Sequence, residues 1–305
     1  MKITPYRELK LRDELLPLFQ HAFWWPFNPQ EFEKIVKADP RLQHSPVGYA
    51  AIDDNRLVGF VGVMDITTRT LEDSEEKVGG IWGVVTHPAH ARRGISKTLM
   101  KRSHEHFREE GYKFSLLNTS KSLIAYSIYR KLDYKDVIIY PSVYKVIPDQ
   151  KKKKTKKTSR KTKLNWNKIL EIFAKATKDQ TGFVVRSPRY GKMLETRKRV
   201  QPRKSIISEN GYALLKEEGG NVTIQEIIAS TKKGTDKLIT QSEENAKKVV
   251  IAEAVLDNNL QKNYLSHEFM LLEVSYDLLM SKPLTKASFM EVYGHKFYAA
   301  ATDYF

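Results

Sequence analysis

The 305-residue sequence contains no cysteine, and this absence excludes several kinds of chemistry. Disulfide bonds, thiolate-ligated zinc and cysteine nucleophiles all require the missing side chain. The sequence also lacks an apolar run long enough to span a membrane, and its start, Met-Lys-Ile-Thr-Pro-Tyr, is not typical of a signal peptide. These absences predict a cytoplasmic protein with no metal site and no membrane partner.

The excess of positive charge is concentrated in one short segment of the chain. The net charge is +16, yet residues 150–163 alone hold nine Lys or Arg and no Asp or Glu. Self-repulsion and the lack of apolar side chains predict a flexible, exposed linker there. Residues 151–163 could bind nucleic acid through phosphate contacts, but they carry no aromatic residues for base stacking. A solvated tether is therefore the favoured interpretation.

The most informative stretch runs from Val84 to Met100. It reads as a buried strand, a loop marked by Pro88, two arginines at 92 and 93, Gly94, and then a helix. Gly94 lets backbone approach a ligand closely, and the first turn of a helix presents unpaired N–H groups. These donors, the positive helix end and the arginines favour a phosphate or pyrophosphate. Taken alone, the pattern also fits an ordinary turn with solvated arginines.

The segments after this turn identify its context. A helix from about Arg93 to Glu110 ends at Gly111, the strand 113–117 follows, and a second helix carries Tyr129. This succession resembles the GNAT superfamily of N-acetyltransferases. In that family the turn holds the coenzyme A pyrophosphate, and a late tyrosine protonates the leaving thiolate. The resemblance assigns this role to Tyr129; core packing beside the neighbouring tyrosines is the structural alternative.

The same resemblance implies that acetyl-CoA is the co-substrate. In the family, the strand before the turn splays from its neighbour, and the pantetheine arm bonds to its backbone there. The chain departs from the family pattern at Ala91, Ser96 and Asp133, but Ser is small and Asp tolerates a left-handed cap. The residues expected to contact acetyl-CoA are Val84, Val85, Thr86, Arg92, Arg93, Gly94, Ile95, Ser96, Lys97, Ser122 and Ala125.

The second half resembles the cofactor-free second domain of the Eis-like tandem acetyltransferases, on the segments Gly182–Arg186, Gly211–Leu215 and Ile224–Glu226. We expect a helix over 166–176, a strand over 182–186, a hairpin of 211–215 with 222–228, a helix over 242–250 and a strand over 268–274. No second Arg-Arg-Gly turn occurs after residue 164, so a single coenzyme site is expected.

The predicted fold class is α/β with a mixed sheet, arranged as two tandem GNAT-like domains. Residues 1–149 form the catalytic domain with the acetyl-CoA site and end with a strand over 137–147. Residues 150–163 form the Lys-rich linker, and residues 164–305 form the second domain with an aromatic C-terminal tail. Eis-like enzymes usually carry a third, sterol-carrier-like domain, for which this chain is too short.

The general base is assigned by the resemblance to Phe305, because in Eis-like enzymes the carboxylate of a terminal Phe takes the proton of the amine. Asp65, Glu31, Glu33 or a chain of waters are alternatives. His87 and His90 flank the turn and are expected to be positioning or surface groups rather than bases. The aromatic segment 24–27 corresponds to the lip of the acceptor cleft, where simple packing is slightly favoured over exposure.

The predicted function is transfer of an acetyl group from acetyl-CoA to a primary amine by direct attack in a ternary complex. The acceptor is either a small molecule, such as an aminoglycoside-like amine, or a lysine side chain. Eis-like relatives assemble as oligomers, so a homo-oligomer is expected. Two other hypotheses are kept: a nucleic-acid- or ribosome-associated protein that uses the linker, and a scaffold that binds coenzyme A without turnover.

Overall fold

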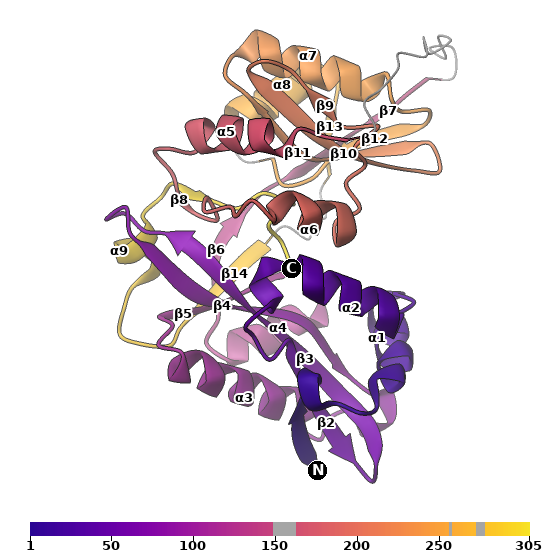
Figure 1. Cartoon of the computed structure of the whole chain (residues 1–305), viewed down its shortest axis with the longest axis vertical. Coiled ribbons are helices and arrows are strands. Elements are labelled where there is room, and N and C mark those ends of the chain that lie inside the picture. Colours follow the sequence, from indigo (N-terminus) through magenta and orange to yellow (C-terminus); the bar gives the residue numbers. More distant parts are fainter. Residues whose placement is uncertain (149–162, 256–257, 273–277) are drawn as a thin grey trace.

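The computed structural model describes residues 1–148, 163–255, 258–272 and 278–305. These residues form two mixed β-sheets, each covered by helices, and the two lie end to end along the long axis of the molecule (Figure 1). We call the sheet that contains the N-terminus, with its helices, the first lobe, and the other sheet with its helices the second lobe. The predicted linker lies outside the described residues except for Lys163.

The first sheet is mixed because β4 and β5 run parallel, whereas the other neighbours along its main path are antiparallel. Two short strands, β8 (Thr181–Gly182) and β15 (Phe297–Tyr298), extend it beside β3. The order along the main path is β1 (Lys2–Pro5), β2 (Gly48–Asp53), β3 (Arg56–Arg69), β4 (Glu75–Thr86), β5 (Phe114–Thr119), β14 (Leu278–Pro283) and β6 (Lys135–Ile139).

Alternation along β3 decides which helices cover each face of the first sheet. Val61 and Val63 are buried under α3 and α4, whereas Phe60 and Met64, one residue out of phase, are buried under α1 and α2. The helices of this lobe are α1 (Leu15–Phe23), α2 (Pro29–Ala38), α3 (Ile95–Glu109) and α4 (Ile124–Lys131).

The second sheet is covered in the same way. Tyr212 and Leu214 pack against α5 and α6, and Ala213 and Leu215 pack against α7 and α8. Its strand order is β13 (Met270–Leu272), β7 (Ser142–Val146), β12 (Val249–Ala252), β11 (Asn221–Ala229), β10 (Gly211–Glu218) and β9 (Ile206–Ile207). Its helices are α5 (Trp166–Ala176), α6 (Tyr190–Thr196), α7 (Lys232–Glu243) and α8 (Asn258–Ser266), and α9 (Phe289–Tyr293) lies near the C-terminus. The predicted α/β class with mixed sheets is confirmed.

The two lobes exchange strands, which the sequence interpretation did not anticipate. The strand expected over 137–147 is divided: β6 joins the first sheet and β7 joins the second. Pro141 lies at the division, where its missing N–H and fixed φ interrupt a ladder. In return, β14 enters the first sheet between β5 and β6. The predicted boundary at residue 149 therefore does not coincide with the division between the sheets.

Two other expected elements are wrong. The helix expected over 242–250 is replaced by α7, which begins earlier because the Thr231 hydroxyl accepts a hydrogen bond from the Gly234 N–H at 3.1 Å, and by β12. The strand expected over 182–186 is only β8, because Gly182 has a φ of 87° and turns the chain inward.

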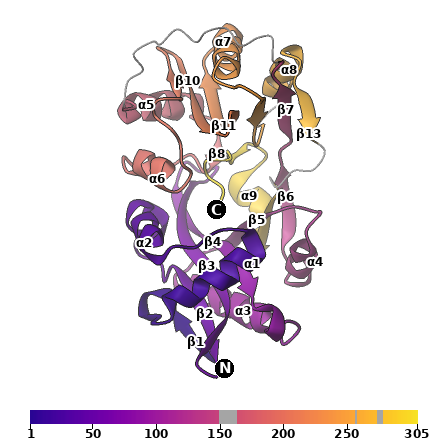
Figure 2. The same ribbon diagram turned by 90° about the vertical axis from the view of Figure 1, so that its right-hand side faces the viewer.

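The C-terminus lies between the lobes rather than at the far end of the second one (Figures 1 and 2). The chain crosses the second sheet, returns through β14 into the first, and then passes through α9 and β15 to Phe305. Residues 299–304 are all buried. None of the described helices is long and apolar enough to cross a membrane.

We predict that Leu279→Ala, in the exchanged strand β14, lowers the free energy of unfolding by about 3 kcal/mol, because Leu279 is fully buried in the core under α1 and α2. Urea unfolding followed by circular dichroism measures the change. Leu271→Ala, at a side chain 45% exposed on β13, is the control and should have a much smaller effect. Equal effects would contradict the placement of β14 in the first core.

Candidate functional site

The turn between β4 and α3 has the geometry of an anion site. Gly94 precedes α3 with a φ of 75°, and a Cβ placed on it would meet no heavy atom within 4 Å. Thr98 donates the first helical hydrogen bond, to the Gly94 carbonyl at 2.9 Å. The N–H groups of Ile95, Ser96 and Lys97 therefore have no partner within the helix, and they open toward the side where Gly94 leaves space.

Arg92 and Arg93 add exposed positive charge to this turn. Arg93 is 61% exposed, and its guanidinium lies 4.0 Å from Asp53 and 3.4 Å from Nδ1 of His90. His87 accepts a hydrogen bond from a backbone N–H two residues later, at 3.2 Å. Both histidines thus make exposed contacts within the loop itself.

The splay between β4 and β5 is present. Parallel pairing covers only Gly79–Ile81 of β4 opposite Ser115–Leu117 of β5. Beyond Ile81, among the described strands, β4 pairs only with β3 and β5 pairs only with β14. A bulge at Gly83, whose φ is 58°, begins the divergence. The segment Val84–Thr86 therefore presents backbone groups to the opening between the strands.

The start of α4 faces the same edge of the sheet as this turn, because the carboxyl ends of two parallel strands lie together. The hydroxyls of Thr86 and Ser96 are 2.6 Å apart and tie the end of β4 to the first turn of α3. Ser122 lies just before α4, with its hydroxyl 2.8 Å from that of Ser120. Ala125 is partly buried against the core under α3 and α4. The expected acetyl-CoA contacts thus come from two neighbouring strand ends.

Tyr129 differs from the two tyrosines beside it. The Tyr134 hydroxyl bonds to His104 at 2.9 Å and to Ser115 at 2.6 Å. The exposed Tyr126 hydroxyl donates to a carboxylate at 3.2 Å. Tyr129 is buried, and its hydroxyl has no hydrogen bond to the residues that the structure describes. Burial raises the pKa of Tyr129 to about 12, so the group is protonated at neutral pH.

A cavity of about 1110 Å³ lies between the lobes. Trp82 and Gly83, where the splay begins, form part of its wall, and so does Phe305. A Cβ placed on Gly80 of β4 would lie 3.2 Å from the Phe305 ring. The C-terminal residue therefore lies in the cavity beside the splayed strand.

The acidic side chains considered as alternative bases have different surroundings. Glu31 lines the cavity. Glu33 accepts hydrogen bonds from Tyr6 and Arg12, both at 2.9 Å, and is thus already paired. The Asp65 carboxyl faces His106 of α3, on the sheet face opposite to Phe305, and burial raises its pKa. Of these three carboxylates, only Glu31 shares the cavity with Phe305.

The aromatic lip is divided between packing and exposure. Phe27 is buried and stacks on Phe19 with ring centroids 5.3 Å apart. Trp24 has a φ of 52° at the end of α1 and is 84% exposed, and it lines the cavity with Trp25. Packing was favoured for this whole segment, and Trp24 is the exception because the left-handed turn points it away from the core.

A buried network of charges holds the tail that ends in Phe305. The side chain of Arg186 is 2% exposed and bonds to Glu226 at 2.6 and 2.8 Å and to Asp303 at 3.1 Å. The Tyr190 hydroxyl also donates to Asp303. Arg41 donates to the Asp303 carbonyl at 2.8 Å, which links the tail to the first lobe. Burial would raise the pKa of Glu226, but the charge of Arg186 keeps it below its usual range.

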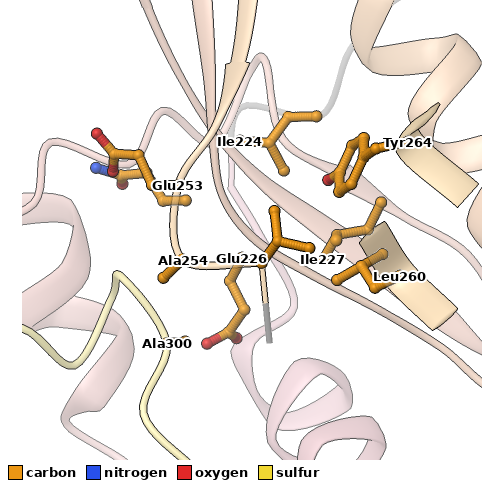
Figure 3. Close-up of a pocket in the computed structure, with 10 residues that line it drawn as sticks. Ile224, Glu226, Ile227, Glu253, Ala254, Leu260, Tyr264 and Ala300 are labelled. Atoms are coloured by element: carbon orange, nitrogen blue, oxygen red, sulfur yellow. The ribbon is translucent and has the colours of Figure 1, made fainter. Parts of the chain in front are cut away.

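A small pocket on the other side of this network is lined by Ile224, Glu253, Leu260 and Tyr264 (Figure 3). Its volume of about 10 Å³ has room for one water molecule at most. Figure 3 shows the Glu226 carboxylate pointing toward the segment of the C-terminal tail that contains Ala300. The Glu226 side chain therefore bonds to the C-terminal tail. The pocket beside it is too small for a substrate.

Sequence reasoning missed the part of the cavity wall that comes from the second lobe. Arg197, Lys198 and Arg199 follow α6 and line the cavity. Three consecutive basic residues directly after a helix were a signal for a ligand site. Their position opposite the first lobe depends on long-range packing, which the sequence pattern does not reveal. Within the described residues, no group of three His, Asp or Glu side chains could hold a metal ion.

Residues 6–137 match the family model described as an acetyltransferase (GNAT) domain. No curated protein matches the chain in sequence. Among solved structures, a GCN5-related N-acetyltransferase from Kribbella flavida is 16% identical, with a TM-score of 0.64 over 93% of this chain and 72% of that one. Eis1 from Mycobacterium abscessus is 14% identical, with a TM-score of 0.56 over 93% and 73% of the two chains.

A tandem GNAT protein from the clavulanic acid biosynthesis pathway is 10% identical, with a TM-score of 0.56 over 94% of this chain and 99% of that one. At these identities the likeness concerns the fold. It extends over both lobes, in agreement with the resemblance to tandem proteins.

We predict that Arg186→Met lowers the free energy of unfolding by about 3–5 kcal/mol, because it leaves two buried carboxylates without their cation. Urea unfolding at pH 7 measures the loss. Arg189→Met, at an exposed residue three positions later, is the matched control and should change stability by less than about 0.5 kcal/mol. A similar small change for Arg186→Met would contradict the network.

Proposed function

We propose that this protein transfers the acetyl group of acetyl-CoA to a primary amine by direct attack in a ternary complex, since residues 6–137 match the model of a GNAT acetyltransferase domain. One observation carries the proposal: the splayed strand β4 leads into an open helix N-terminus and also borders a cavity that holds the C-terminal residue. The helix N-terminus suits the anionic part of acetyl-CoA, and the cavity leaves room for the amine acceptor.

The pyrophosphate of acetyl-CoA is proposed to bind the N–H groups of Ile95–Lys97, with Arg92 and Arg93 adjacent. Two features support this assignment. The space beside Gly94 is open, and the positive end of α3, a 15-residue helix, points into it. The backbone of Val84–Thr86 would bond the pantetheine arm in place of β5, and Ser122 and Ala125 border the same edge.

Tyr129 is proposed as the acid that protonates the departing sulfur. Its free hydroxyl and its pKa of about 12 keep the proton on the phenol until the reaction needs it. The burial that raises this pKa also disfavours a thiolate beside it, so proton donation removes a charge that the surroundings do not stabilise.

The Phe305 carboxylate is proposed as the base. An amine reaches the protein mainly as an ammonium ion and must lose a proton before its nitrogen attacks the thioester carbonyl. As the C–N bond forms, the C–S bond breaks and the sulfur takes the proton of Tyr129. The new amide nitrogen then loses its second proton, which returns the tyrosinate to its neutral form. Support for Phe305 comes from its place in the cavity beside β4. Glu31, on the same wall, is the alternative.

Calorimetric titration with acetyl-CoA tests the site. We predict one site per chain, and we predict that Gly94→Glu weakens binding by about tenfold or more, since a carboxylate would meet the pyrophosphate and the left-handed φ would be strained. Gly111→Glu, at the other end of α3 with a φ of 78° and open space, carries the same strain and should bind normally. Absence of binding to the unchanged protein would overturn the proposed function.

Tyr129→Phe tests turnover separately from binding. We predict that kcat falls by about 100-fold or more while the Kd for acetyl-CoA is unchanged, because only the proton donor is removed. Tyr126→Phe, which removes an exposed hydroxyl on the same helix, is the control and should keep its rate. Thiol release measures kcat. An undiminished rate in Tyr129→Phe would exclude the acid role, and binding without any turnover would favour a scaffold.

A further inference from the structure

The wall of the cavity between the lobes carries more positive than negative charge. Two of its cations are already paired: Lys216 lies 2.9 Å from Glu218, and Arg197 lies 3.0 Å from Asp39. Asp39 also binds Arg41 at 2.9 Å, so one buried carboxylate serves two guanidinium groups. Arg41 also faces Asp303, which shares Arg186 with Glu226, so these buried charges balance. Outside this network the wall carries four Lys or Arg side chains against Glu31, Glu218 and the Phe305 carboxylate.

Further cations on the wall have no carboxylate of their own. Within the described residues, no ion pair is formed by Lys34, Lys198 or Arg199. Lys198 is enclosed, and burial together with the neighbouring Arg197 and Arg41 lowers its pKa to about 7, although the carboxylates of Glu253 and Asp303 partly oppose this shift. An anion placed beside Lys198 would favour its charged form and would relieve the repulsion from these neighbours.

The facing wall is aromatic. Trp24 is 84% exposed and Phe23 is 48% exposed, both at the end of α1, and Trp25 adjoins them. Exposed aromatic surface of this extent inside a cavity is available to pack against an apolar ligand. The cavity thus combines aromatic side chains at the end of α1 with basic side chains that follow α6, and Glu31 and Lys34 of α2 also line it.

We propose that the acceptor is an amine that also carries an anionic group, a carboxylate or a phosphate, which Lys198 and Arg199 bind while its apolar part packs on Trp24 and Trp25. This inference rests on the proposed acetyl transfer. It excludes a polycationic amine of the aminoglycoside type as the preferred acceptor, since such a molecule would bring further positive charge to an already basic wall. The two cations leave the acceptor's amine free to face β4 and Phe305.

The experiment measures kcat/KM by thiol release for matched amines. Tryptophan against tryptamine compares a carboxylate with no anion on the same ring, and O-phosphoethanolamine against ethanolamine does the same for a phosphate. Kanamycin represents polycationic amines. Each ratio is measured for the unchanged protein, for Lys198→Met and for Arg199→Gln. Lys192→Gln, at an exposed lysine on α6 outside the cavity wall, is the control.

The unchanged protein should prefer at least one anionic amine over its partner by about tenfold or more, and Lys198→Met should remove most of that preference by raising KM. Which pair shows it distinguishes a carboxylate from a phosphate. Comparing ratios between variants cancels the different basicity of the amines. Arg199→Gln, at an exposed residue, gives a second measurement that does not depend on the folding of Lys198→Met.

Two results would overturn the inference while leaving the proposed function intact. One is faster acetylation of kanamycin or of the anion-free partners, and the other is a preference for anionic amines that survives in both variants. The proposed function itself fails only if acetyl-CoA does not bind or no amine releases thiol. Calorimetry with acetyl-CoA on the same samples separates these cases.

Discussion

The structure depends on one buried interaction, the bonding of Arg186 to Glu226 and Asp303. The guanidinium also lies 3.5 Å from the ring of Phe173, so apolar and acidic groups enclose it together. Glu226 belongs to the second sheet and Asp303 to the tail, and Arg41 attaches the same tail to the first lobe. The second lobe, whose sequence contains no second Arg-Arg-Gly turn, thereby holds Phe305 in the cavity between the lobes. A buried ion pair adds little stability by itself, but here it specifies where one end of the chain lies.

The site combines parts that the sequence revealed to very different degrees. The turn at Gly94 and the helix of Tyr129 were predicted from local patterns, a glycine before a helix and a helix that follows a short apolar strand. The splay of β4 was expected only from the family resemblance. The sequence pattern does not reveal that the Tyr129 hydroxyl has no hydrogen-bond partner among the residues that the structure describes. This state depends on Tyr134 being taken up by His104 and Ser115, which come from other elements.

The exchange of strands was missed for a related physical reason. The segment Leu278–Pro283 is largely apolar and buried, but its six residues contain no pattern that indicates which of the two sheets the strand joins. Its partners, β5 and β6, lie more than a hundred residues earlier in the chain. Likewise, Pro141 interrupts the apolar segment 137–147 in the sequence. A proline at this position fits a bend within one sheet as well as a crossing of the chain into another sheet. The basic wall after α6 faces the first lobe only because of this long-range packing.

The strand exchange also sets the order of events during protein synthesis. A ribosome releases the segments β1 to β6 early, yet the first sheet is complete only after β14 has been made, because β14 lies between β5 and β6. A nascent chain halted before residue 278 would hold β5 and β6 apart with their edges unpaired, in a form exposed to chaperones and proteases. Loss of β14 by premature termination would therefore affect the first sheet, although the break in the chain lies far along the sequence in the second half.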